Sequence, residues 1–308
     1  MLLIVLKDVS KTLGHKKVLN EISLHIGENE HVGLIGLNGA GKTTLLNVIA
    51  GVIKPDNGFI RTNGRESIIE DNESLRELVY LSGARSPLWG ELTVRASLDH
   101  CRKMYRIDRQ TFAGRLERLT TIFETGALMD RRPGNLSLGE RMRCELVYAL
   151  LAEPRILLLD EVLVGIDVSV KHKIIQFLEV FRKEKQVTVI DTSNDLAEVE
   201  KLCGRVILIH EGKIIFDGKA ERMINEFSPY YRMEVKMTDG LPDLEDLPLE
   251  KYRVDSDVLT IDYDKQKIET TQLLRHLMKQ GSIGNVRLFE PDLEGTIRRI
   301  YGGRKWKA

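Results

Sequence analysis

The N-terminal part of the chain carries apolar positions in the pattern of strands that lead into a helix. Residues 2–26 predict two strands around a turn at Gly14-His15. The apolar run His31–Gly36 predicts a buried strand, which passes through a glycine-rich turn into a helix over Lys42–Ala50 that ends at Gly51.

The middle of the chain alternates between helical and strand patterns. Residues 95–151 are rich in amphipathic helical stretches, with a break at Arg132–Gly134. Apolar runs at Ile156–Leu159 and Val187–Ile190 predict two strands, and 169–184 predict a helix between them. Strand-helix-strand order predicts a largely parallel sheet with helices on its faces, and therefore the α/β fold class.

A second, smaller α+β domain is predicted after Pro229, so the domains are 1–228 and 229–308. The stretch Asp239–Glu250 is polar, contains two prolines and is typical of a loop or linker. The elements predicted around it are strands near 231–237, 252–254, 258–263 and 285–289, and helices near 268–280 and 293–301.

Charge and composition exclude several classes of protein. Lys+Arg and Asp+Glu both number 46, so the chain lacks a general basic surface for nucleic acid, and no nucleic-acid partner is expected. No apolar run approaches the ~20 residues of a membrane helix, so any membrane role is predicted to be peripheral. The 3 cysteines have no CxxC spacing, which indicates buried or free thiols in a reducing cytosol.

The segment Gly36–Thr43 fits the phosphate-loop pattern GxxxxGK[ST]. Glycines let backbone N–H groups surround an anion, the following helix directs its positive end at the same point, and Lys42 adds a charge for the β- and γ-phosphates. The residues predicted to bind the phosphates are Gly36, Asn38, Gly39, Ala40, Gly41, Lys42, Thr43 and Thr44. The alternative is a plain glycine-rich turn, and the loop alone does not separate NTPases, kinases and switch proteins.

Two carboxylates, Asp160 and Glu161, end the strand Ile156–Leu159. A carboxylate at the carboxyl end of a strand beside the phosphate loop is where Mg²⁺ needs an anchor. Asp160 is therefore assigned to Mg²⁺ together with Thr43, and Glu161 is the predicted general base that polarises the attacking water. The alternative is an acidic pair that only caps a buried strand.

The segment Leu136, Ser137, Leu138, Gly139 and Glu140 resembles the LSGGQ signature of the ABC ATPases, at the usual spacing before the acidic strand. Ser137 and the helix after it could meet a γ-phosphate. In that family two cassettes pair head to tail around two ATP molecules, and the resemblance implies that Asp167 lies in the loop that crosses this interface. The alternative for Ser137 with Glu140 is a simple helix-capping box.

The resemblance covers about residues 4–218 and implies a P-loop ABC cassette: a RecA-like core, an antiparallel β subdomain and a helical signature subdomain at about 95–151. Leu136–Leu151 and Leu202–Val206 are similar to bacterial cassettes whose permeases are separately encoded, often exporters. The resemblance therefore implies an ATP-hydrolysing subunit that uses Mg²⁺ and pairs with a second cassette in a homodimer or heterodimer. It also implies that this subunit drives a permease from the cytoplasmic face of the cell membrane.

Several positions depart from the family pattern, among them Glu140 in place of the usual glutamine of the signature and Val162-Leu163 in place of the usual proline and threonine. Leu13 stands where an aromatic residue usually stacks on adenine, Ala84 where a glutamine usually contacts Mg²⁺ and water, and Asn194 where a catalytic histidine usually contacts the γ-phosphate. Asn194 can still donate a hydrogen bond but cannot carry positive charge. We expect slow or partner-dependent hydrolysis, with near-normal turnover and ATP binding without turnover as alternatives.

Other functions remain open at this point. A translation or DNA-repair ABC protein is disfavoured, because only one phosphate loop and one signature are present and the interval between them is short. The P-loop kinase hypothesis does not explain the segment Leu136–Glu140. A regulatory ATP-gated module with little turnover would explain it and stays an alternative. Trp89, where the permease-coupling surface of the family begins, is predicted to be packed, with an exposed permease anchor as the alternative.

Overall fold

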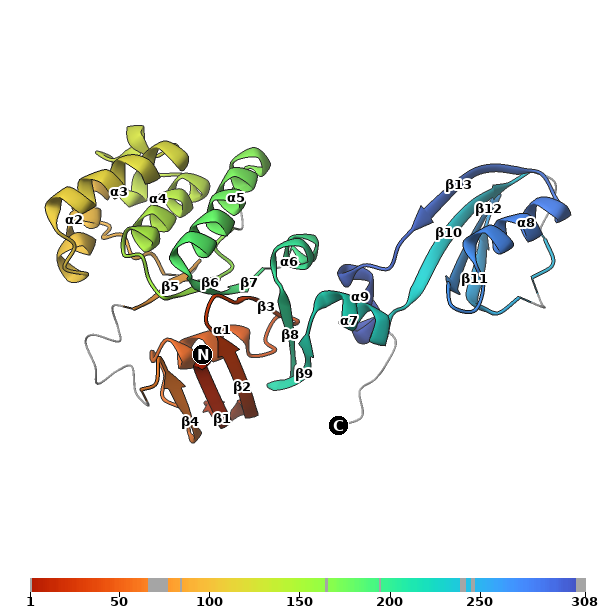
Figure 1. Ribbon diagram of the computed structural model, residues 1–308, viewed down its shortest axis with the longest axis horizontal. Helices are drawn as coiled ribbons and strands as arrows, with labels where there is room; N and C mark the ends of the chain where they lie inside the picture. Colours follow the sequence, from red (N-terminus) through yellow and green to blue (C-terminus); the bar gives the residue numbers. More distant parts are fainter. Residues whose placement is uncertain are drawn as a thin grey trace. The chain divides into compact units, whose positions relative to one another are not determined.

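The structure is a computed structural model of the 308-residue chain. It describes residues 2–65, 77–83, 85–163, 166–193, 195–238, 242–244 and 247–302. The chain forms two compact units, Met1–Gly218 and Lys219–Ala308 (Figure 1). Helix α7 (Ala220–Phe227), which the sequence placed in the first domain, belongs to the second unit because it packs against α9 (Leu293–Gly302).

The first unit is organised around a six-stranded sheet, which confirms the predicted α/β cassette fold. Its strands run in the order β5 (Leu78–Ser82), β6 (Ile156–Asp160), β7 (Thr188–Thr192), β3 (His31–Ile35), β8 (Arg205–His210) and β9 (Lys213–Gly218). Neighbouring strands are parallel except β8 and β9. Strand β6 is buried along its whole length, which explains its uninterrupted apolar sequence.

Two layers cover this sheet (Figure 1). On one face lie α1 (Lys42–Ile49) and a three-stranded antiparallel sheet of β2 (Lys16–Gly27), β1 (Leu2–Leu13) and β4 (Asn57–Thr62), which share one apolar core with the inner strands. The other face packs against α2 (Val94–Met104), α4 (Leu138–Leu151) and α5 (Val168–Lys185). Helix α3 (Arg109–Ile122) joins that second core, and α6 (Leu196–Leu202) precedes β8.

The predicted helix-rich region is present, and each of its described α-helices, α2, α3 and α4, begins at a polar cap. The side chains of Thr93, Asp108 and Ser137 accept hydrogen bonds from the first turns of α2, α3 and α4. The predicted break at Arg132–Gly134 is a short 3₁₀ helix, Pro133–Asn135, and another spans Gly126–Leu128.

The second unit contains an antiparallel sheet in the order β11 (Leu249–Asp255), β12 (Val258–Asp264), β10 (Tyr230–Met237) and β13 (Ile283–Phe289). Helix α8 (Thr270–Gln280) packs on one face through Leu273 and Leu277, which join the buried residues of β10 and β12. These elements match the strands and helices that the sequence predicts after Pro229.

Two predictions from composition can be compared with the structure. The 3 cysteines, Cys101, Cys144 and Cys203, are buried free thiols, as expected. Among the described residues, no helix is both long and apolar enough to cross a membrane.

Candidate nucleotide-binding site

The phosphate loop is held in a conformation that only glycine allows at its two ends. Gly36 has φ 153°, and a Cβ there would lie 2.3 Å from the backbone oxygen of Ile209 on β8. Gly41 has φ 115°, and a Cβ there would lie 2.9 Å from the backbone oxygen of Val18 on β2. The backbones of β8 and β2 therefore pack closely against the two ends of the loop. The tip of the loop, which includes Gly39, is exposed.

Helix α1 begins at this loop with its backbone donors free of a side-chain cap. Gly41 is the N-cap and makes no side-chain hydrogen bond to the first turn. An uncapped helix start leaves N–H groups and a positive end available to an anion. Thr43, in the first turn, is exposed, whereas Thr44 is buried.

Lys42 connects the loop to the acidic pair. Its side chain is buried, and Nζ donates to the carbonyl oxygens of Gly36 at 2.8 Å and Leu37 at 3.3 Å. Burial lowers the pKa of Lys42, while the nearby Glu161 and Asp160 act in the opposite direction. The structure thus brings together the two motifs that are far apart in the sequence.

Asp160 lies at the end of β6 and is 6% exposed. Its Oδ1 accepts a hydrogen bond from Thr192 Oγ1 at 2.6 Å, and its Oδ2 accepts one from the Tyr80 hydroxyl at 3.2 Å. A carboxylate and the Thr43 hydroxyl are oxygen donors, which fit Mg²⁺, an ion that proteins commonly hold by one or two carboxylates together with substrate phosphates. These residues therefore fit the predicted metal.

Glu161 follows with a left-handed backbone, φ 56°. Its N–H donates to Thr192 Oγ1 at 3.1 Å. A glutamate in this conformation is strained by about 1–2 kcal/mol. The left-handed backbone of Glu161 ends strand β6, and Glu161 is half-buried.

The signature segment forms the start of α4. Ser137 Oγ accepts from the Glu140 N–H at 3.3 Å, and the Glu140 carboxylate accepts from the Ser137 N–H at 2.8 Å. The capping box is therefore present. Ser137 is exposed and Leu138 is 47% exposed, while Leu136 and Gly139 are half-buried.

Of the remaining predicted residues, the structure describes Leu13 and Asp167. Leu13, at the end of β1, is 44% exposed. Asp167 is the N-cap of α5, and its Oδ1 accepts from the Ser169 N–H at 2.9 Å. Ala84 and Asn194 lie outside the described residues.

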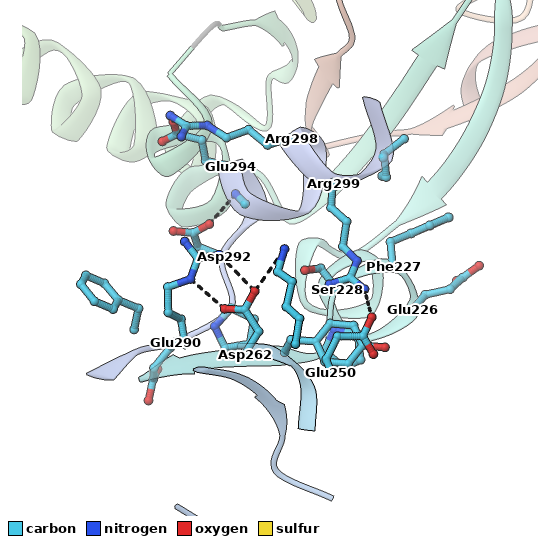
Figure 2. Close-up of a pocket in the computed structure, with 18 residues that line it drawn as sticks. Glu226, Phe227, Ser228, Glu250, Asp262, Glu290, Asp292, Glu294, Arg298 and Arg299 are labelled. Atoms are coloured by element: carbon cyan, nitrogen blue, oxygen red, sulfur yellow. Dashed lines mark hydrogen bonds and ion pairs between the residues drawn. The ribbon is translucent and has the colours of Figure 1, made fainter. Parts of the chain in front are cut away.

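A crevice of about 1160 Å³ lies in the second unit, among α7, β10 and the start of α9 (Figure 2). Its basic side chains are ion-paired: Arg232 and Lys251 with Asp262, Arg298 with Glu294, and Arg299 with Glu250. Because these cations are already neutralised by protein carboxylates, the crevice is poorly suited to a triphosphate, and Lys42 marks the better site.

Comparison with known proteins decides the family. The model of the family described as "ABC transporter" matches residues 19–164. The ABC transporter ATP-binding protein NatA of Bacillus subtilis is 32% identical over 225 residues, which are 72% of this chain and 91% of the relative. The chain belongs to the ABC transporter ATP-binding proteins. It is therefore an ABC-type ATPase by family.

Other similarities extend this assignment within the ABC family. The O-antigen export system ATP-binding protein RfbB of Klebsiella pneumoniae is 35% identical over 208 residues, 67% of this chain and 78% of the relative. Further relatives are named as sulfate, molybdenum and methionine import proteins. A solved structure of the ATP-binding subunit of an ABC transporter aligns with TM-score 0.68 and 26% identity, over 73% of this chain and 93% of that one.

The ABC cassette contains two site residues that the sequence did not reveal, Tyr80 and Thr192. Both lie on strands next to β6, and each donates to one oxygen of Asp160. Burial and the neighbouring Asp160 raise the pKa of Tyr80. The only sequence signal was a polar residue near the end of a strand, which does not show which carboxylate it meets.

Asp191 and Ser193 lie near Asn194 in the sequence. Asp191 pairs with Leu159 across the sheet, whereas Asp160 pairs with Thr192, so Asp191 points to the opposite face from Asp160. Burial raises its pKa to about 6. The Ser193 hydroxyl accepts from the Asp195 N–H at 3.0 Å. The side chain of Asp191 is thus directed away from the nucleotide site.

Proposed function

We propose that this chain binds Mg-ATP and hydrolyses it slowly to drive a separately encoded membrane permease, as an exporter subunit at the cytoplasmic face of the membrane. The carrying observation is the site in which buried Lys42 lies beside Asp160 and Glu161 at the end of the parallel sheet. In this proposal Lys42 holds the phosphates, Asp160 and Thr43 hold Mg²⁺, and Glu161 orients the attacking water.

Nucleotide binding is tested with the variant Lys42→Ala. We expect its Mg-ATP affinity to fall by at least tenfold, because the loop loses the charge directed at the phosphates. Arg118→Ala, which removes an exposed cation on α3 paired with Glu184, is the control for general loss of charge. Equal Mg-ATP affinities of wild type and Lys42→Ala, measured by calorimetry, would rule out this loop as the site.

A second cassette completes the site in this proposal. The start of α4 at Ser137 is exposed, and the positive end of this helix supports contact with the γ-phosphate held by another cassette. Glu161→Gln should trap the pair in ATP, and its mass is measured with the permease and any partner cassette present. A complex with one cassette at saturating ATP would contradict the sandwich.

The proposed direction of transport has two supports. The sequence of Leu136–Leu151 resembles that of exporter cassettes, and the chain is similar to RfbB. The import proteins among the relatives keep the opposite direction as a competing possibility. A transport assay in vesicles that contain the permease separates the two, since ATP outside inverted vesicles drives uptake for an exporter. ATP-dependent uptake seen only in right-side-out vesicles loaded with ATP would reject export.

A further inference from the structure

The carboxylate of Asp160 is held on both oxygens by hydroxyl groups from the two strands that flank it. Thr192 on β7 donates to Oδ1 at 2.6 Å, and Tyr80 on β5 donates to Oδ2 at 3.2 Å. The sheet order β5-β6-β7 places these strands on either side of Asp160. The acid is therefore held by one donor from each neighbouring strand.

The strand register explains why the three side chains meet. Asp160 pairs with Thr192 across β6 and β7, and with Ser82 across β5 and β6. Tyr80 lies two residues before Ser82, so it projects from the same face. This is the face that shares a core with α1, the helix that begins at Lys42.

Burial makes these contacts specific. Thr192 is fully buried and Asp160 is 6% exposed, so water does not compete for their polar atoms. A buried charged acceptor with a fixed donor keeps one orientation, because each alternative rotamer loses a charge-assisted hydrogen bond. An ionised carboxylate has about four lone-pair positions, so two donors leave positions free for a cation or its water.

The same threonine also fixes the next residue. Thr192 Oγ1 accepts from the Glu161 N–H at 3.1 Å, at the point where the backbone turns left-handed. One hydroxyl therefore joins the metal-holding acid to the backbone of the predicted general base. A change at Thr192 alters both groups together, whereas a change at Tyr80 alters Asp160 alone.

We propose that Thr192 and Tyr80 are positioning residues that fix the Asp160 carboxylate for Mg²⁺, and that Thr192 also fixes Glu161. The inference rests on the proposed Mg-ATP site. It differs from a purely structural role, in which the hydroxyls only satisfy a buried acid and their removal changes stability without changing metal affinity.

The test uses Thr192→Val, which removes the hydroxyl and keeps the branched shape, and Thr192→Ser, which keeps the hydroxyl. Thr188→Val is the matched control, because Thr188 is a buried threonine on the same strand whose hydroxyl donates to Gly27 O at 3.1 Å. In each full-length variant, binding of a fluorescent non-hydrolysable ATP analogue is titrated with Mg²⁺, and Mn²⁺ affinity is measured by electron paramagnetic resonance.

Partners of metal ligands typically change metal affinity by about 10–100-fold when removed. We expect Thr192→Val to weaken Mn²⁺ and Mg²⁺ binding at least tenfold, with metal-free nucleotide affinity within about twofold of wild type. Thr192→Ser should restore most of the metal affinity, and Thr188→Val should leave it unchanged. Tyr80→Phe should weaken it several-fold, and this variant decides the question if Thr192→Val does not fold.

Two failures are distinguishable. If wild type shows no Mg²⁺-dependent nucleotide binding, the proposed function is wrong. If wild type shows it, but folded Thr192→Val and Tyr80→Phe keep metal affinities within twofold of wild type, only the positioning role is refuted and the hydroxyls are structural.

Discussion

Replacement of Gly36 by alanine tests whether the phosphate loop is set by the strands around it. The added Cβ would lie 2.3 Å from Ile209 O and 3.1 Å from Ile209 Cγ2. The backbone oxygen of Ile209 cannot easily move away from this Cβ, because β8 is paired with β3 on one side and with β9 on the other. The variant must therefore distort the loop, the sheet or both.

The size of the effect follows from two contributions. An alanine at φ 153° is strained, by about 1–3 kcal/mol, and overpacking adds about 1–3 kcal/mol. We therefore expect a loss of roughly 4 kcal/mol in the free energy of unfolding. For a unit of this size that loss corresponds to a melting temperature lower by roughly 8–16 °C.

Gly39→Ala is the matched control, because Gly39 has φ 80° and a Cβ there meets no atom within 4 Å. Only the backbone strain remains, about 1–2 kcal/mol. Both variants are melted as full-length protein in a scanning calorimeter without nucleotide. Melting temperatures of the two variants that agree within the error of the scan would refute the account of loop packing.

Three further outcomes are expected. Ala84→Gln combined with Asn194→His should raise ATP turnover about tenfold or more with the permease present, since one transition-state hydrogen bond is worth about 3 kcal/mol; wild-type turnover equal to that of the reverted protein would show that the departures are compensated. Glu179→Gln should lower the free energy of unfolding by about 1 kcal/mol near neutral pH. Because the hydrogen bond with His31 holds the pKa of Glu179 at about 2, the difference in stability between wild type and variant should vanish as acid unfolding is followed from pH 4.5 towards 2. Asp262→Leu should destabilise the second unit in urea unfolding more than Asp257→Leu, because Asp262 is buried between two cations and Asp257 is an exposed partner of one.

The elements that the sequence predicted are those whose signal is local. Strand β6 reads as an apolar run because both faces of it are covered, and α1 follows from a glycine-rich turn. The cap at Ser137 was readable from the spacing to Glu140 alone. Each of these features depends on residues within a few positions of one another.

Features that depend on lateral neighbours were not predicted. Tyr80 and Thr192 reach Asp160 only because β5 and β7 flank β6, and sequence order does not give that arrangement. Trp89 was expected to be packed but is 53% exposed, with its ring 4.8 Å from that of His100. It lies in the loop between β5 and α2, where one neighbouring ring does not enclose so large a side chain.

The residues that this cassette shares with the family pattern are not equally strong evidence for ATP turnover. Gly36 and Lys42 are held by the fold, since one is pressed against β8 and the other is buried against its own loop. Their presence is therefore explained by packing as well as by chemistry. Glu161 is different, because glycine would adopt its φ of 56° with less strain, and binding of the phosphates does not require a carboxylate at this position. A carboxylate beside Asp160 instead suits the proposed general base, which favours the proposed hydrolysis over nucleotide binding alone.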